Sequence, residues 1–224
     1  MFNAVSNLMV GGSVHSLEGR HFDVVELLDT VEHKRINSMS IVGDPFAKPI
    51  LRALDAEPRS WDISSLRVIV SSGVMWSAES KAGLLHHNER LILVDSLGSS
   101  EAIGMASSTT TSGSVGKTAT FRLGENTRVV TEDGRDVVPG SGERGRVAMR
   151  GYTPVGYYKD PEKSAATFIK IDGVRYSMPG DWAEVDADGT VRLLGRGSQC
   201  INTGGEKVYP EEVEEVLKLH PSVA

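Results

Sequence analysis

Apolar residues follow two different spacings along the first half of the chain. Between residues 22 and 34 they recur three and four positions apart, which predicts an amphipathic helix. Further helices are predicted at 45–55 and 78–88, and short apolar runs predict buried strands at 37–43, 66–70 and 90–94. Pro49 either interrupts the second helix or starts it. Buried strands that alternate with helices indicate an α/β fold with a parallel sheet flanked by helices.

The pattern changes after residue 106. Residues 107–116 are polar and contain glycine, so we predict a loop there. Two β-rich runs follow, at 127–138 and 182–194, and each has an Asp-Gly pair near its centre, which is a strong hairpin signal. We therefore expect an α/β subdomain over residues 1–118 and an antiparallel β subdomain over residues 119–195.

A third segment covers residues 196–224. It starts with a glycine-rich stretch and continues into a predicted helix that Pro210 opens and that two glutamates follow in the first turn. The apolar stripe of this helix has only three residues, which is too few to form a core alone. We expect the segment to pack against a part that this sequence does not contain. The glycines suit a hinge, and an ordinary loop is the alternative.

Composition narrows the class of protein. A chain of 224 residues fits one large domain or two small ones, and its net charge of −6 argues against a broad nucleic-acid or anionic-membrane footprint. The single cysteine excludes an intrachain disulfide and agrees with a reducing cytosol. The first residues lack a signal-peptide pattern, and no apolar run is long enough to span a bilayer. We expect a cytoplasmic protein.

The stretch DSLGSSE, residues 95–101, is the first candidate for chemistry. It follows the predicted strand 90–94, and ligands of parallel α/β sheets bind at the carboxyl ends of strands. The stretch offers backbone amides, three hydroxyls and Glu101, whose carboxylate suits Mg²⁺. The alternative is a serine-rich helix start in which Ser99 or Ser100 is the N-cap.

Asp181 and Arg196 form the second candidate. They are fifteen residues apart, but the predicted hairpin between them returns the chain, so both side chains can reach one site. A carboxylate can accept hydrogen bonds from two neighbouring hydroxyls, as on a ribose, and a guanidinium can bind hydroxyls or phosphate. The alternative is an aspartate of a turn and an arginine of the surface.

The stretch GSVGKT, residues 113–118, is close to the end of a Walker A phosphate loop. That motif requires glycine where this chain has Thr111, and it requires a buried strand before it, where the chain has SSTTTS. We therefore interpret the stretch as a turn between subdomains.

The order of these motifs resembles that of the adenylate-forming superfamily, which includes acyl-CoA synthetases, luciferases and peptide-synthetase adenylation domains. DSLGSSE is similar to the family's YGxTE motif, with Leu97 in place of the aromatic residue. YSMPGDWAEVDADGTVRLLGR is similar to its yxTGDxxxxdxdGyxxxxGR run. The other similar stretches are SSGVMWS, GSVGK, GERGRVAMRGYTPVGYYKDPEKS and GGEKVYPEEVEEVL. The last of these is most like fatty acyl-CoA synthetases of the actinobacterial type.

The resemblance implies a two-step reaction. A carboxylate attacks the α-phosphate of Mg-ATP to give an acyl-adenylate and pyrophosphate, and a thiol, usually coenzyme A, then displaces AMP. The implied substrates and cofactors are therefore ATP, Mg²⁺, a fatty acid and coenzyme A. Residues 196–224 would be the hinge and first helix of a truncated C-terminal lid domain.

The resemblance also implies roles for individual residues. Asp181 would bind the ribose hydroxyls, Arg196 would contact the ribose or the α-phosphate, and Glu101 would hold Mg²⁺. Ser198 falls at the hinge position. The full set of implied nucleotide-binding residues is Gly73, Val74, Asp95, Ser96, Leu97, Gly98, Ser99, Ser100, Asp181 and Arg196.

Two elements of the family pattern do not occur in this sequence. The Ser/Thr/Gly-rich phosphate loop would lie before Met1, and the catalytic lysine of the lid would lie after Ala224, so we assign no catalytic residue. Two alternatives to a ligase stay open. One is a non-catalytic nucleotide- or acyl-binding module, or a subunit that another chain or a second copy completes. The other is an amino-acid-activating domain of a peptide synthetase.

This reading predicts that the 224-residue chain alone activates no fatty acid at a useful rate. Acyl transfer through an adenylate depends on stabilising the charge of the phosphates, and both the phosphate loop and the lysine are missing from the sequence. We expect no ATP–pyrophosphate exchange above background with medium- and long-chain fatty acids. Robust exchange by the purified chain would overturn this expectation.

Overall fold

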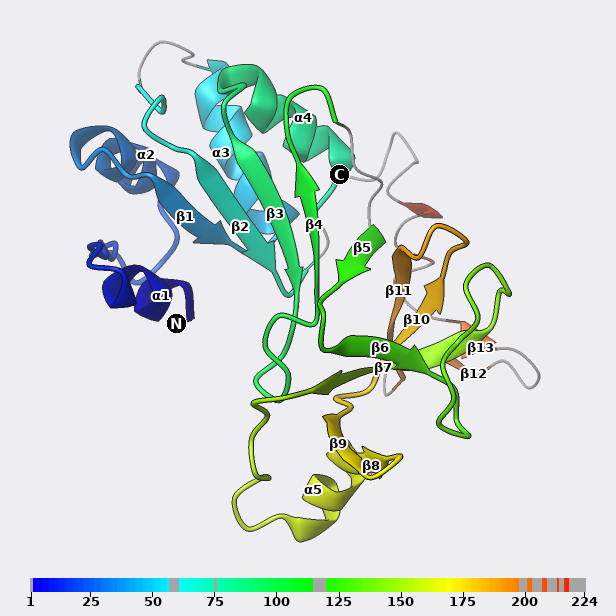
Figure 1. The fold of residues 1–224 in the computed structure, drawn as a ribbon. Coiled ribbons are helices and arrows are strands. Elements are labelled where there is room, and N and C mark those ends of the chain that lie inside the picture. The colour runs from blue at the N-terminus through cyan, green and yellow to red at the C-terminus, as the bar shows by residue number, and fades with distance from the viewer. Residues whose placement is uncertain are drawn as a thin grey trace. The chain divides into compact units, whose positions relative to one another are not determined.

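The computed structural model describes residues 2–56, 61–74, 76–114, 120–197, 201–202, 207–208, 213 and 216–217 (Figure 1). The chain forms two compact units. The first contains Met1–Asp95 and Thr109–Thr118, and the second contains Ser96–Ser108 and Ala119–Ala224. Each unit has its own apolar core.

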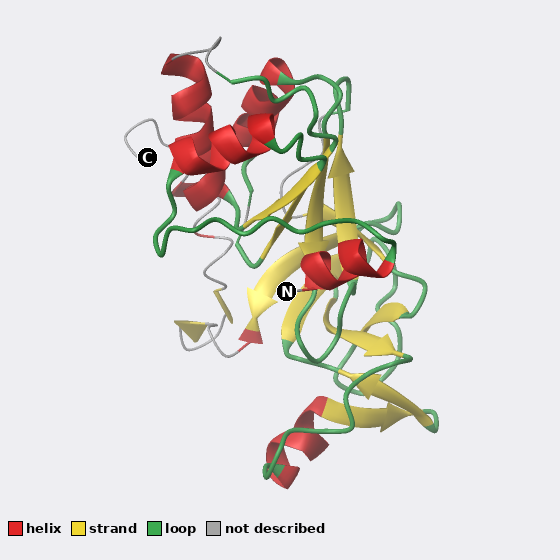
Figure 2. Ribbon diagram, turned by 90° about the vertical axis from the view of Figure 1, so that its left-hand side faces the viewer, coloured by secondary structure: helices red, strands yellow, loops and turns green. Residues whose placement is uncertain are grey.

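The first unit is built on a parallel sheet. Strands β1 (Ser38–Ile41) and β2 (Val68–Ser72) run parallel, and β3 (Ile92–Leu97) is the next neighbour of β2. Helices α2 (Val24–His33), α3 (Asp44–Ala56) and α4 (Ala78–His87) alternate with these strands, and α1 (Phe2–Met9) precedes them. Figure 2 shows α3 and α4 on the same side of the strands. The core between these elements includes Leu28, Ile50, Ile69, Trp76, Leu84 and Leu93.

Local sequence sets the helix boundaries. The Asp23 carboxylate accepts hydrogen bonds from the N–H groups of Val25 and Glu26, and the Ser77 hydroxyl accepts one from Ser80, so α2 and α4 are both capped. Both predicted alternatives for Pro49, a break in the helix or its start, are wrong, because α3 begins at Asp44 and continues through the proline. An interior proline costs about 3 kcal/mol. Burial of Ile50 and Leu54 offsets this cost, since each buried side chain contributes about 1.5–3 kcal/mol.

The second unit is an antiparallel sheet with one short helix. Its strands follow the order β5-β11-β10-β7-β9-β8, and β6 pairs with β7. Their bounds are β5 (Thr120–Leu123), β6 (Thr127–Val130), β7 (Arg144–Arg150), β8 (Phe168–Ile171), β9 (Val174–Ser177), β10 (Asp181–Val185) and β11 (Val191–Arg196), and the helix is α5 (Pro161–Thr167). Met105, Val129, Val147, Ala183 and Val191 form its main core.

Both Asp-Gly hairpins are confirmed. The N–H of Thr131 donates to the carbonyl of Arg135 around the first pair, and the N–H of Asp186 donates to the carbonyl of Thr190 around the second. The predicted loop at 107–116 is wrong in its first part, because β4 (Ala106–Thr110) is a strand that pairs with β5. Its two threonines are β-branched and suit a strand in spite of their polarity.

Much of the third segment lies outside the described residues, including the predicted hinge at Ser198 and most of the predicted helix. Within it, β12 (Ile201–Asn202) pairs antiparallel with β13 (Lys207–Val208). The predicted subdomain and lid boundaries stay predictions. Among the helices that the structure describes, none has the length and apolar content that a membrane span requires.

Shortening Leu93 tests the core of the first unit. The side chain is 0% exposed, so Leu93→Ala removes buried methyl groups and leaves a cavity. We expect a loss of about 2–5 kcal/mol in the free energy of unfolding, measured by urea denaturation. The neighbouring Ile92 is 41% exposed, and Ile92→Ala is expected to cost much less. Equal losses in the two variants would contradict the assigned core.

Candidate functional site

The β10–β11 hairpin places Asp181 directly opposite Arg196. The two residues are register partners at the open end of the hairpin, where β10 starts and β11 ends. The register shifts between Trp182 and Ala183, and Gly195 has a φ of 115°. A bulge of this kind re-aims the end of a strand, and glycine adopts the required backbone angle without strain. The N–H of Gly197 donates to the carbonyl of Gly180 at 3.0 Å, which holds the two chain ends together beyond the pair.

The two side chains make an asymmetric ion pair. Nε of Arg196 donates to Oδ1 of Asp181 at 3.4 Å. The Asp181 side chain is only 7% exposed, whereas the guanidinium is about half exposed. The second carboxylate oxygen of Asp181, Oδ2, is buried and has no hydrogen-bond partner. Such an orphaned acceptor is uncommon in native proteins and points to a donor that a ligand or water supplies.

Burial changes the ionisation of this aspartate. Desolvation raises the pKa of Asp181 above its ordinary value, and the neighbouring Glu101 carboxylate acts in the same direction. The charge and the hydrogen bond of Arg196 act against it and favour the ionised form. A buried carboxylate whose ionisation is costly is typical of a functional site.

Glu101 lies in the same electrostatic environment. The Tyr157 hydroxyl donates to Oε1 of Glu101 at 2.6 Å, and this bond is the main cause that lowers the pKa of Glu101. The charge of Arg196 also lowers it. Glu101 is therefore an anion at neutral pH, near the guanidinium that pairs with Asp181. The second unit alone thus brings together Glu101, Asp181 and Arg196 with one residue that the sequence analysis gave no role, Tyr157.

The stretch 95–101 differs in part from its prediction. Residues 95–97 belong to β3, so the expected loop begins only at Gly98. The N-cap alternative is wrong, because no helix follows Ser99 or Ser100. Instead, the N–H of Glu101 donates to the Ser99 hydroxyl at 3.2 Å, and Ser99 and Ala102 exchange backbone hydrogen bonds. This local turn fixes the backbone that carries the Glu101 carboxylate.

Asp95 has a partner that the sequence did not indicate. Its carboxylate pairs with the ammonium of Lys81, which is buried on α4, and Lys81 lies 5.6 Å from the centroid of the Trp76 ring. Desolvation raises the pKa of Asp95, while Lys81 lowers it. This pair belongs to the first unit, so the Asp95 side chain is occupied there.

The remaining predicted residues fall on both units. Gly73 and Val74 follow β2 in the first unit, and Gly73 has a φ of 90°, which suits glycine. Ser96 and Leu97 are the last residues of β3 and belong to the second unit, where Leu97 packs against the core. Gly98 is closely packed, since a Cβ there would lie 3.1 Å from the backbone nitrogen of Gly104. Their roles toward a nucleotide stay predictions.

The residues present fit a magnesium site of the kind that substrate phosphates complete. Among the described residues, no group of three or more His, Cys, Asp or Glu side chains gathers to form a metal cage. Mg²⁺ usually needs only one or two carboxylates, and it takes its other ligands from water and phosphates. Glu101 is anionic and partly accessible, with Oε1 held by Tyr157. The donor set therefore suits Mg²⁺ bound together with a nucleotide.

The curated proteins that are similar to this chain include several CoA ligases. No family model matches the chain. A medium/long-chain-fatty-acid–CoA/3-oxocholest-4-en-26-oate–CoA ligase of Mycobacterium tuberculosis is 44% identical over 203 residues, which are 90% of this chain and 37% of that ligase. A 3-oxocholest-4-en-26-oate–CoA ligase of Rhodococcus rhodochrous is 43% identical over 225 residues, covering 97% of this chain. The chain therefore spans about two fifths of the length of the curated relatives it matches, at 37% and 40%.

Among solved structures, the anthranilate CoA ligase AuaEII in complex with anthranoyl-AMP superimposes with a TM-score of 0.75 at 26% identity. The match covers 95% of this chain and 39% of the ligase. This similarity extends over both units and agrees with the mixed α/β architecture described above.

The Asp181→Asn variant tests the ionisation of the buried carboxylate. The pKa of folded Asp181 lies above 3.8, so its stabilising contribution is complete below the unfolded-state value and falls as the pH rises through the folded-state value. Relative to wild type, we expect the unfolding free energy of Asp181→Asn to increase between about pH 4 and pH 7. The increase should be about 1.4 kcal/mol for each unit by which the folded pKa exceeds the unfolded one.

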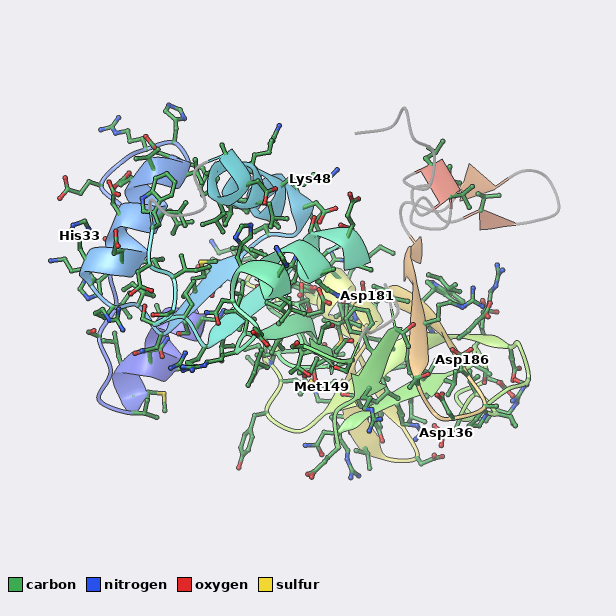
Figure 3. The ribbon with its side chains drawn as sticks, turned by 90° about the horizontal axis from the view of Figure 1, so that it is seen from above. His33, Lys48, Asp136, Met149, Asp181 and Asp186 are labelled. Atoms are coloured by element: carbon green, nitrogen blue, oxygen red, sulfur yellow. The ribbon has the colours of Figure 1, made fainter. Side chains whose placement is uncertain are left out.

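Urea denaturation at both pH values measures this difference, and Asp186→Asn is the control. Asp186 is an exposed residue at the turn of the same hairpin, and Figure 3 labels both aspartates. Because this side chain is exposed, we expect the control substitution to change the unfolding free energy little. A constant offset between wild type and Asp181→Asn at all pH values would contradict the assigned burial.

Proposed function

We propose that this chain, which belongs to the adenylate-forming superfamily, supplies the ribose- and phosphate-binding part of an ATP-dependent acyl-CoA ligase. Its relatives are acid–thiol ligases at 43–44% identity, which is the ground for the reaction class. In that reaction a carboxylate oxygen attacks the α-phosphorus of ATP, and pyrophosphate leaves. The thiol of coenzyme A then attacks the acyl carbon, and AMP leaves.

The observation that supports nucleotide binding best is the buried Oδ2 atom of Asp181, which has no partner. Leaving a buried acceptor unpaired costs about 1–3 kcal/mol. Two neighbouring hydroxyls of a ribose can donate to the two oxygens of one carboxylate, and they would remove this penalty on binding. Because Oδ1 is shared with the Arg196 guanidinium at 3.4 Å, a weak hydrogen-bond distance, a ribose hydroxyl can compete for it.

Arg196 and Glu101 would complete the polar part of the site. The Arg196 guanidinium is half exposed, so it can keep its attraction to Asp181 and still donate to a ribose oxygen or to the α-phosphate. The Glu101 carboxylate would hold Mg²⁺, which neutralises phosphate charge when it is bound. Ser100 is adjacent to Glu101 and would present its hydroxyl to the phosphates. Gly73, Val74 and Asp95 stay candidates from the resemblance, whereas Glu101, Asp181 and Arg196 all belong to the second unit.

The acyl substrate is proposed to be a fatty acid or another apolar carboxylic acid. The relatives that align over nine tenths of the chain or more are named for fatty acids and for a steroid acid. This coverage favours an acyl-CoA ligase over an amino-acid-activating domain of a peptide synthetase. We place the activity in the cytoplasm, because a chain with one cysteine cannot form an intrachain disulfide and agrees with a reducing compartment.

Binding of AMP to the purified chain tests the proposal. Removing a carboxylate that accepts hydrogen bonds from ribose costs about 1.5–3 kcal/mol, so we expect Asp181→Ala to weaken AMP binding by roughly 10–100-fold in titration calorimetry. Asp186→Ala removes an exposed carboxylate of the same hairpin and is expected to leave the affinity unchanged.

Two outcomes would reject the proposal. If the wild-type chain binds no AMP at millimolar concentration, the second unit has no nucleotide site of its own. If Asp181→Ala and the wild type bind AMP equally, the nucleotide lies elsewhere. The comparison of 2′-deoxy-AMP with AMP adds a second measure, because loss of one ribose hydroxyl should weaken binding to wild type and have no further effect on Asp181→Ala.

A further inference from the structure

The segment from Gly156 to Ser164 is built around the backbone of Tyr157. The N–H of Tyr157 donates to the Ser164 hydroxyl at 2.8 Å, and that hydroxyl donates in turn to the carbonyl of Asp160 at 2.6 Å. The Asp160 carboxylate caps α5 by accepting from the N–H of Lys163. Lys159, in the turn between them, has a φ of 56°, which is uncommon for a residue with a side chain. One short turn is thus tied to the start of α5 at several points.

Gly156 allows this arrangement. A Cβ at position 156 would lie 2.9 Å from the Ser164 hydroxyl oxygen, closer than a carbon atom can normally approach. Only glycine therefore lets Ser164 reach the N–H of the following residue without displacement. The consequence is a fixed direction for the Tyr157 side chain relative to α5.

The ring of Tyr157 also contacts a cation and a second aromatic ring. The Lys163 ammonium lies 4.3 Å from the ring centroid, and the Phe168 ring lies at a centroid distance of 5.8 Å. The hydroxyl at the end of the Tyr157 ring donates a hydrogen bond to Oε1 of Glu101 at 2.6 Å. The two residues are 56 positions apart in sequence, so the bond ties the turn at 98–101 to the α5 segment.

The Tyr157 hydroxyl holds the Glu101 side chain through a direct hydrogen bond to one of its carboxylate oxygens. A phenol that donates to Oε1 restricts the orientation of the Glu101 carboxylate, and Ser99 also hydrogen-bonds to this carboxylate. Partners of this kind orient metal-binding carboxylates in general.

We propose that Tyr157 is a positioning residue that orients the Glu101 carboxylate to receive the divalent cation of a bound metal–nucleotide complex. The inference rests on the proposed function, because it takes Glu101 as the metal ligand. Gly156 and Ser164 support it indirectly by fixing the direction of the tyrosine. Tyr157 touches neither the nucleotide nor the metal in this arrangement and acts through Glu101 alone.

The experiment compares ATP binding with and without a divalent metal. Titration calorimetry gives the affinity of the chain for Mn²⁺–ATP and for ATP in excess chelator, and the ratio of the two measures the contribution of the metal. Tyr157→Phe keeps the ring and its contacts with Lys163 and Phe168 but removes the hydroxyl. We expect this variant to lower the ratio about 10-fold, while the affinity for ATP in chelator stays within about twofold of wild type.

Three controls make the result specific. Tyr158→Phe changes the neighbouring tyrosine, which is 88% exposed, and should leave the ratio unchanged. Glu101→Gln keeps an acceptor for the Tyr157 hydroxyl but removes the charge, and should bring the ratio close to one. Ser164→Ala removes the acceptor for the N–H of Tyr157 and should lower the ratio by less than Tyr157→Phe does. Thermal unfolding midpoints report whether each variant keeps the wild-type fold.

The outcomes distinguish metal binding by Glu101 from the positioning role of Tyr157. If Glu101→Gln lowers the ratio and Tyr157→Phe does not, the metal site stands and the positioning role of Tyr157 is rejected. If Glu101→Gln leaves the ratio at the wild-type value, Glu101 is not the metal ligand and the positioning role of Tyr157 is rejected with it, whereas ribose binding at Asp181 is tested separately by AMP. If Tyr157→Phe lowers ATP affinity equally with metal and with chelator, its role is general packing, and the positioning role is again rejected.

Discussion

The ion pair between Asp181 and Arg196 is the interaction on which the functional interpretation depends. It exists because a hairpin with a bulge near its open end brings two distant residues into register. The pair is asymmetric, since the carboxylate is buried and the guanidinium is half exposed. Burial of the aspartate is unfavourable unless both oxygens find donors, and the structure provides a donor to only one of them. An unfavourable group maintained at a strand end is better explained by binding than by stability.

Electrostatic coupling extends this pair to the neighbouring turn. The charge of Arg196 favours the ionised forms of both Asp181 and Glu101, although desolvation still raises the pKa of Asp181 above its ordinary value. The Arg196 guanidinium therefore interacts electrostatically with two carboxylates and forms an ion pair with that of Asp181. The Asp181 carboxylate would accept hydrogen bonds from the ribose hydroxyls of a nucleotide. The Arg196 guanidinium would attract its phosphates, and the Glu101 carboxylate would bind the metal ion. These are the three kinds of group that a metal–nucleotide complex requires.

Several hydrogen bonds hold Glu101 in place. The Glu101 backbone is fixed by a turn in which Ser99 accepts its N–H, and its side chain is fixed by Tyr157. Tyr157 in turn depends on a segment in which glycine, serine and a capped helix constrain one another. The orientation of the Glu101 carboxylate thus depends on the packing of the segment that carries Tyr157.

Local sequence patterns determined most of the secondary structure of this protein. Spacing of apolar residues predicted α2, α3, α4 and the three strands β1 to β3, and Asp-Gly pairs predicted both hairpins, because these signals act within a few residues. The hairpin also sufficed to predict that Asp181 and Arg196 meet. Polarity misled the prediction at β4, where β-branched threonines and pairing with β5 decide for a strand, and Pro49 misled it in α3, where packing outweighs a missing hydrogen bond. Tertiary structure alone decided that Tyr157 reaches Glu101, that Lys81 neutralises Asp95 and that Oδ2 of Asp181 is left without a partner. Each of these depends on distances between segments far apart in sequence and on burial from water, and no local pattern of residues encodes either quantity.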